Sequence, residues 1–129
     1  MEKEEIIIEG LTPEVEEKIA AKVNELKESN PKDRIFPIVI EGDEEYGEKP
    51  VYVGYFKQPS FPIFSKYLTA SQKSDQAVAM RTLARDCFVE GDKELIDDDS
   101  LFLFGLMGQL SEIIKIRQGK LVNLSKTRK

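Results

Sequence analysis

The sequence predicts an α+β fold, in which an N-terminal helix and a small antiparallel β-hairpin precede a compact half of three helices. Two observations carry this prediction. Two short segments rich in β-branched and aromatic residues lie between positions 35 and 57. From position 61 onward, apolar residues recur with a period of about 3.6, which is typical of helices. A length of 129 residues fits one globular domain with a real core.

The N-terminal helix is predicted from its start, its spacing and its end. Thr12 is a good N-cap residue, and Pro13 suits the first turn of a helix. The helix ends at the sequence Ser29-Asn30-Pro31. Its apolar residues recur at spacings of three and four, at Val15, Ile19, Val23 and Leu26. Before this helix, residues 5–9 (EIIIE) form a short β-branched run.

The β-hairpin is predicted at Ile35–Glu41 and Val51–Lys57. Residues 42–50 between them are acidic and contain glycine, so we expect a loop there. Pro37 lies inside the first segment and has no amide hydrogen to donate. We therefore expect the first strand to lie at an edge of the sheet or to be irregular.

Three helices are predicted in the second half of the chain. The first spans residues 61–68, opens with Pro62 and is followed by a polar break at residues 71–74. The second is capped by Ser74-Asp75, carries an apolar stripe and ends near Val89. The third spans about residues 98–118 and is strongly apolar.

Charge, apolar stretch length and cysteine content argue against nucleic-acid-binding, membrane-spanning and secreted proteins. Residues 1–50 carry 15 acidic and 7 basic side chains, and residues 51–129 carry 9 and 12, which gives the net charge of −5. Nucleic-acid binding requires clustered Lys and Arg, so we expect no nucleic-acid partner. The most apolar stretch, residues 101–110, is shorter than the roughly 20 residues of a membrane span. With a single cysteine and an acidic start, we expect a cytoplasmic protein that has no membrane partner.

We expect one globular domain with three parts. An acidic helix and strand segment spans residues 1–48, and a helical core spans residues 49–118. Residues 119–129 are polar and basic, and we expect a flexible tail there.

Residues 87–99 (CFVEGDKELIDDD) contain six acidic side chains, and we interpret them as the joint between two helices. Gly91 suits the left-handed conformation that often follows a helix. The side chains of Asp97, Asp98 and Asp99 suit the start of the next helix, as cap acceptors and as negative charge at its positive end. The spacing does not fit a calcium loop, and a chain with no histidine and one cysteine does not fit zinc. We therefore expect no metal.

Catalytic residues and cofactors are not expected. Cys87 lies on the apolar stripe of its predicted helix, and the chain has no histidine to act as its base, so we expect a core cysteine. Gly105 and Gly108 lack the Lys-Ser/Thr of a phosphate-binding loop, so we expect them to permit a close helix–helix approach.

The stretch LFLFGLMG at residues 101–108 places large apolar side chains around almost the whole helix. Such a helix is either fully buried or shared with a partner. Burial in the core is the more common case, and as a hypothesis the exposed case forms a groove for a partner, because methionine side chains adapt to different apolar surfaces. The residues expected to line it are Met80, Phe102, Phe104, Leu106 and Met107.

Residues 49–126 resemble the tail assembly chaperones of long-tailed bacteriophages and prophages. The resemblance depends on the order and spacing of several short segments around the long apolar helix. These segments are residues 55–60 (YFKQPS), 87–92 (CFVEGD), 96–99 (IDDD) and 119–124 (GKLVNL).

The resemblance implies a non-enzymatic assembly factor in the host cytoplasm. Such chaperones bind the helical tape measure protein and bring tail tube protein subunits to polymerise around it. Two other classes remain open. One is a self-associating structural or regulatory adaptor that buries LFLFGLMG against a second copy. The other is a small hydrolase that holds a divalent ion with Asp92 and residues 97–99.

Overall fold

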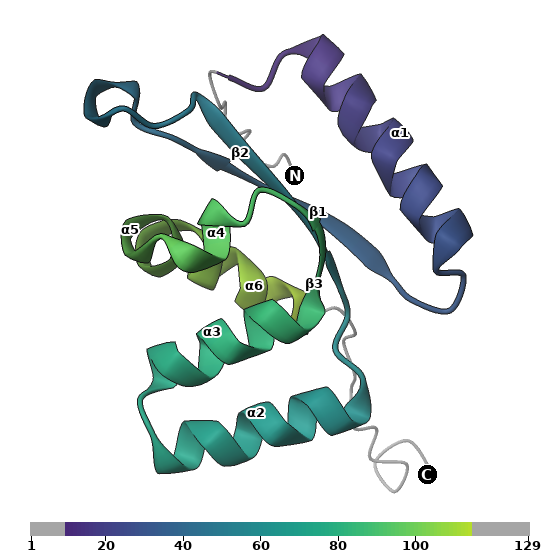
Figure 1. The fold of residues 1–129 in the computed structure, drawn as a ribbon. Helices are drawn as coiled ribbons and strands as arrows, with labels where there is room; N and C mark the ends of the chain where they lie inside the picture. The colour runs from purple at the N-terminus through teal and green to yellow at the C-terminus, as the bar shows by residue number, and fades with distance from the viewer. Residues whose placement is uncertain (1–9, 115–129) are drawn as a thin grey trace, which may run out of the picture.

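The computed structural model describes residues 10–114 and confirms the α+β class (Figure 1). The first half contains helix α1 (Pro13–Ser29), strand β1 (Ile35–Glu41), a short 3₁₀ helix η1 (Glu44–Tyr46) and strand β2 (Val51–Lys57). The second half contains α2 (Phe61–Lys73), α3 (Gln76–Cys87), β3 (Phe88–Gly91), α4 (Glu94–Asp97), α5 (Asp99–Leu101), a π-helical segment η2 (Phe102–Leu106) and α6 (Met107–Ile114).

The three strands form one antiparallel sheet in the order β1-β2-β3. The predicted hairpin is confirmed, since Ile35 lies opposite Lys57 and Glu41 opposite Val51. Among residues 10–114, β1 pairs only with β2, so within this described sheet Pro37 lies on an edge strand, as expected. The central strand, β2, therefore pairs with both β1 and β3. Strand β3 was not predicted from the sequence.

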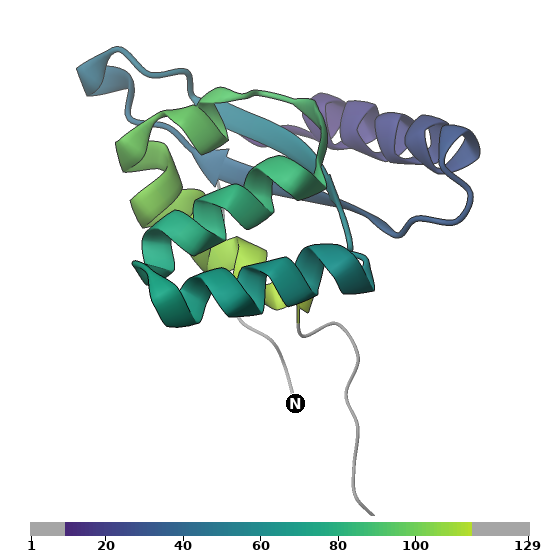
Figure 2. The same cartoon turned by 60° about the horizontal axis from the view of Figure 1, so that its bottom comes forward.

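Helices cover both faces of the sheet, with α1 on one face and α2 to α6 on the other (Figures 1 and 2). Successive side chains of a strand point to opposite faces, so β2 contributes to two cores. Tyr52 and Phe56 pack into the larger core, against the helical half. Tyr55 packs with Leu26 of α1 and Ile35 in the smaller core.

The N-terminal helix begins and ends as predicted. The hydroxyl of Thr12 accepts a hydrogen bond from the amide of Val15 at 3.3 Å, and Asn30 caps the other end through its bond to the carbonyl of Leu26. Leu26 is the buried residue of this helix, and Ile19 and Val23 are partly buried beside it. The residues before Gly10, including the run at 5–9, lie outside the described residues.

Two of the predicted helix ends are wrong. The polar break at residues 71–74 does not exist as such, because α2 continues to Lys73, and the hydroxyl of Ser71 donates to the carbonyl of Leu68. The next helix, α3, ends at Cys87 and not near Val89. Residues 88–91 form β3 instead, because their backbone groups pair with β2 across the sheet.

The third predicted helix is a series of short helical segments. Its expected start is confirmed, since the side chain of Asp98 caps α5. A π-helical turn at Phe102–Leu106 interrupts the series before α6 begins at Met107. The described part ends at Ile114, so the predicted end near residue 118 and the predicted flexible tail lie outside the described residues. The predicted boundary at residue 48 falls in the hairpin loop.

Candidate partner-binding site

The acidic residues 97–99 support the joint between α4 and α5. Asp98 Oδ1 accepts a hydrogen bond from the amide of Leu101 at 3.0 Å. Asp99 pairs with Arg81 of α3 at 2.7 Å, and Asp97 lies 3.7 Å from Arg85. One aspartate therefore caps a helix, as expected, and the other two tie the joint to α3.

Gly91 ends a strand, so the expectation that it follows a helix is wrong. Its φ of 126° lies in the region that favours glycine. A Cβ atom there would lie 2.5 Å from the carbonyl oxygen of Val53, because β3 closely approaches β2 at this point. The glycine is needed for strand pairing.

Asp92 extends this pairing by one residue, which sequence reasoning missed. Its amide donates to the carbonyl of Val53 at 2.9 Å, and its Oδ2 accepts from the amide of Val53 at 2.9 Å. Its Oδ1 pairs with Lys49 at 2.7 Å, and this hydrogen bond raises the pKa of Lys49. Within residues 10–114, no three His, Cys, Asp or Glu side chains are grouped to hold a metal ion.

Cys87 lies in the larger core, as predicted. Burial raises the pKa of its thiol to about 11, and the carboxylate of Asp86 acts in the same direction. The thiol is therefore neutral at ordinary pH, while the thiolate is the nucleophilic form.

The five residues expected to line a client groove do not share one surface. Met80, Phe102 and Leu106 are buried in the larger core, so their placement corrects the expectation that they line an open groove. Met107 is half-buried against that core. Phe104 alone of the five is exposed, with 87% of its surface accessible.

Gly105 and Gly108 do not bring two helices together. A Cβ atom at Gly105 would lie 2.8 Å from Cγ2 of Ile40, so the close approach is between η2 and β1. A Cβ atom at Gly108 would meet nothing within 4 Å. Only one of these glycines is therefore needed for a close contact, and that contact is between a helix and a strand.

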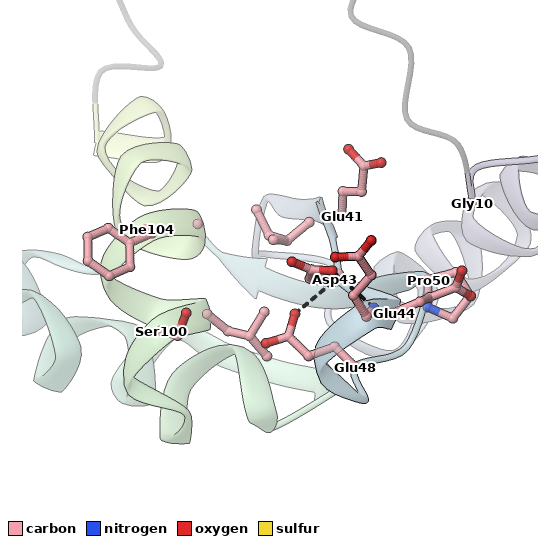
Figure 3. Close-up of a pocket in the computed structure, with 13 residues that line it drawn as sticks. Gly10, Glu41, Asp43, Glu44, Glu48, Pro50, Ser100 and Phe104 are labelled. Atoms are coloured by element: carbon pink, nitrogen blue, oxygen red, sulfur yellow. Dashed lines mark hydrogen bonds between the residues drawn. The ribbon is translucent and has the colours of Figure 1, made fainter.

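A groove of about 620 Å³ lies beside this contact, between the hairpin loop and η2 (Figure 3). We call it the loop groove. Its helical side contains Ser100, Leu101, Phe104 and Gly105, and Ile40 lies on the strand side. Its loop side is strongly acidic and contains Glu41, Asp43, Glu44, Glu45 and Glu48.

Hydrogen bonds within the loop hold the acidic side of the groove in shape. Asp43 Oδ1 accepts from the amide of Glu45 at 3.1 Å and caps η1. Glu48 Oε1 accepts from the amide of Asp43 at 2.7 Å, which closes the loop. Gly47, at a φ of 83°, makes the turn that returns the chain toward β2. The sequence predicted an acidic loop here, but nothing in it placed this loop opposite Phe104.

Comparison with known proteins adds no relative: no protein-family model, no curated protein and no solved structure matches this chain. Across the described residues, none of the helices has the length and apolar character needed to cross a membrane.

Proposed function

We propose that this chain is a phage or prophage tail assembly chaperone, a non-enzymatic factor that binds the helical tape measure protein and assists polymerisation of the tail tube protein. The resemblance of residues 49–126 to that family supports the proposal. So does the presence of an exposed aromatic side chain beside a preformed groove, which suits a protein-binding surface.

The exposure of Phe104 is the observation that carries this proposal. Its neighbours Phe102 and Leu106 are fully buried, so the fold is already anchored on both sides of it. Burying a phenylalanine side chain contributes about 1.5–3 kcal/mol. A partner helix that covers Phe104 would gain this contribution, and aromatic anchors of this kind often dominate binding energy.

The self-associating adaptor is the second candidate. It depends on LFLFGLMG as an interface between two copies, yet Leu101, Phe102 and Leu106 of that stretch are buried within one chain. The exposed remainder is Leu103 and Phe104, a smaller surface than that hypothesis requires.

The first test is co-expression of the tagged chain with the longest helical protein encoded beside its gene. We expect the long protein to be soluble only together with this chain. Phe104→Asp should abolish its recovery without lowering the melting temperature of the chain, because Phe104 contributes little to the core.

Phe61→Asp is the matched control. Phe61 is 84% exposed, at the start of α2 and outside the loop groove, so the same change should leave recovery intact. If this chain and the long helical protein elute independently, the chaperone proposal fails. A purified chain that is a stable oligomer by light scattering, and a monomer as Phe104→Asp, would favour the adaptor.

A further inference from the structure

The carboxylates of the loop groove have no basic partner within the part of the chain that the structure describes. The acidic side chains that line the groove are Glu41, Asp43, Glu44, Glu45 and Glu48. None of these side chains forms an ion pair with a Lys or Arg of residues 10–114. Lys49 is the only basic residue of the loop at 42–50, and it pairs with Asp92. The groove therefore concentrates negative charge on one side, and like charges held close together repel one another.

The opposite side of the groove is apolar. Phe104 is exposed, and Leu101 and Ile40 are also among the apolar residues that line the groove. Figure 3 shows Ser100 and Phe104 on the helical side, across from Asp43, Glu44 and Glu48. This pairing of an acidic and an apolar side is complementary to a segment with basic and apolar side chains.

We propose that the loop groove binds a basic amphipathic segment of the client, with Lys or Arg side chains against Glu44 and Glu45 and a large apolar side chain against Phe104. This inference rests on the proposed function and names the chemistry of the client segment. A volume of about 620 Å³ has room for several side chains of such a segment.

The two sides of the groove contribute differently to binding. Exposed ion pairs are individually weak and are screened by salt, so the acidic side chiefly sets orientation and association rate. The side chain of Phe104 excludes water and provides most of the affinity. Binding should therefore weaken with increasing salt in the intact chain and become less salt-dependent when the acidic side is lost.

The test is titration of the full chain into a fluorescent 18-residue helical peptide of Lys and Leu, with anisotropy as the signal. A peptide with Glu at every Lys position is the ligand control. We expect the Lys peptide to bind and the Glu peptide not to bind. Glu44→Lys with Glu45→Lys should weaken binding at least about tenfold and flatten its salt dependence.

Glu17→Lys with Glu28→Lys is the matched protein control. Both residues are exposed on α1, on the far face of the sheet from the groove, and the change in net charge is the same. This double variant should bind the Lys peptide with an affinity within about twofold of that of the unaltered chain. Equal loss in both double variants would show that net charge attracts the peptide, and would overturn the inference.

The chain itself offers a rival occupant. Residues 115–129 contain six basic and no acidic side chains. Lys126→Glu with Arg128→Glu and Lys129→Glu, in the full chain, should leave peptide affinity unchanged when Glu16→Lys, Glu17→Lys and Glu28→Lys on α1 restore the net charge. A gain of about tenfold or more would show that this segment occupies the groove, and would overturn the assignment to a client.

Co-purification separates a failure of this inference from a failure of the proposed function. If Glu44→Lys with Glu45→Lys still recovers the long helical protein in full, the acidic side of the groove does not bind a basic client segment and the inference fails, although the chaperone function stands. If the unaltered chain recovers nothing, the function itself fails.

Discussion

Cys87 is the single thiol of the chain, and its reactivity is set by its surroundings in the larger core. Because burial raises its pKa to about 11, the reactive thiolate is scarce near pH 8. We expect the native chain to react with a disulfide reagent at least about a hundredfold more slowly than the chain in guanidinium, where the pKa returns to about 8.5. Absorbance of the released thiolate measures both rates, and equal rates would contradict burial.

Residue roles that depend on near neighbours were predictable from sequence. The caps at Thr12 and Asp98 each bind an amide three residues further along, so a short pattern identifies them. Asp92 was not predictable, since its partner Val53 lies 39 residues away. Phe104 was proposed as a contact residue together with four others, and nothing local to the sequence separated it from the buried Phe102.

At the scale of elements, the pairing of β3 with β2 requires a glycine at position 91. Gly91→Ala should lower the free energy of unfolding by about 1–3 kcal/mol, because the strained φ and the contact with Val53 both oppose a Cβ atom. Gly108→Ala is the control, since Gly108 lies in a helix with open space around it. It should raise the free energy of unfolding by about 0.5–1 kcal/mol. Urea denaturation measures both, and equal stability of the two variants would contradict the pairing.

Elements with strong local signals were predicted and short ones were not. The hairpin strands and the start of α1 follow from β-branched segments, a cap and a proline. Strand β3 has four residues and continues an apolar stripe from α3, so it looks like the end of a helix. The π-helical turn has no local signature, because it is fixed by how Phe102 and Leu106 pack on the sheet.

At the scale of the whole molecule, the two faces of the sheet are unequally covered. Helix α1 has one buried residue, Leu26, whereas α3 has five. Local opening costs less where fewer apolar contacts must break. We expect amide hydrogens of α1 to exchange at least about tenfold faster than those of α3, as measured by mass spectrometry. Equal protection of both helices would show that α1 opens only with the entire fold.

The loop groove could not be predicted from the sequence, because it forms between two segments that lie far apart in the chain. Its acidic side comes from residues 41–48 and its apolar side from residues 100–105. The packing of Gly105 against Ile40 brings these two segments together. The sequence pattern of either segment does not indicate that residues 41–48 and 100–105 meet in the fold.

The π-helical turn also bears on how this sequence can change in length. Such a turn is equivalent to an α-helix that carries one additional residue. Loss of Leu103 or Phe104 leads back to an α-helix in which the buried Phe102 and Leu106 still share a face. The same loss within α3 would rotate every later side chain of that helix by about 100°. A one-residue deletion is thus accommodated better at the turn that presents Phe104 than within α3, so this aromatic contact can be removed without changing the rest of the fold.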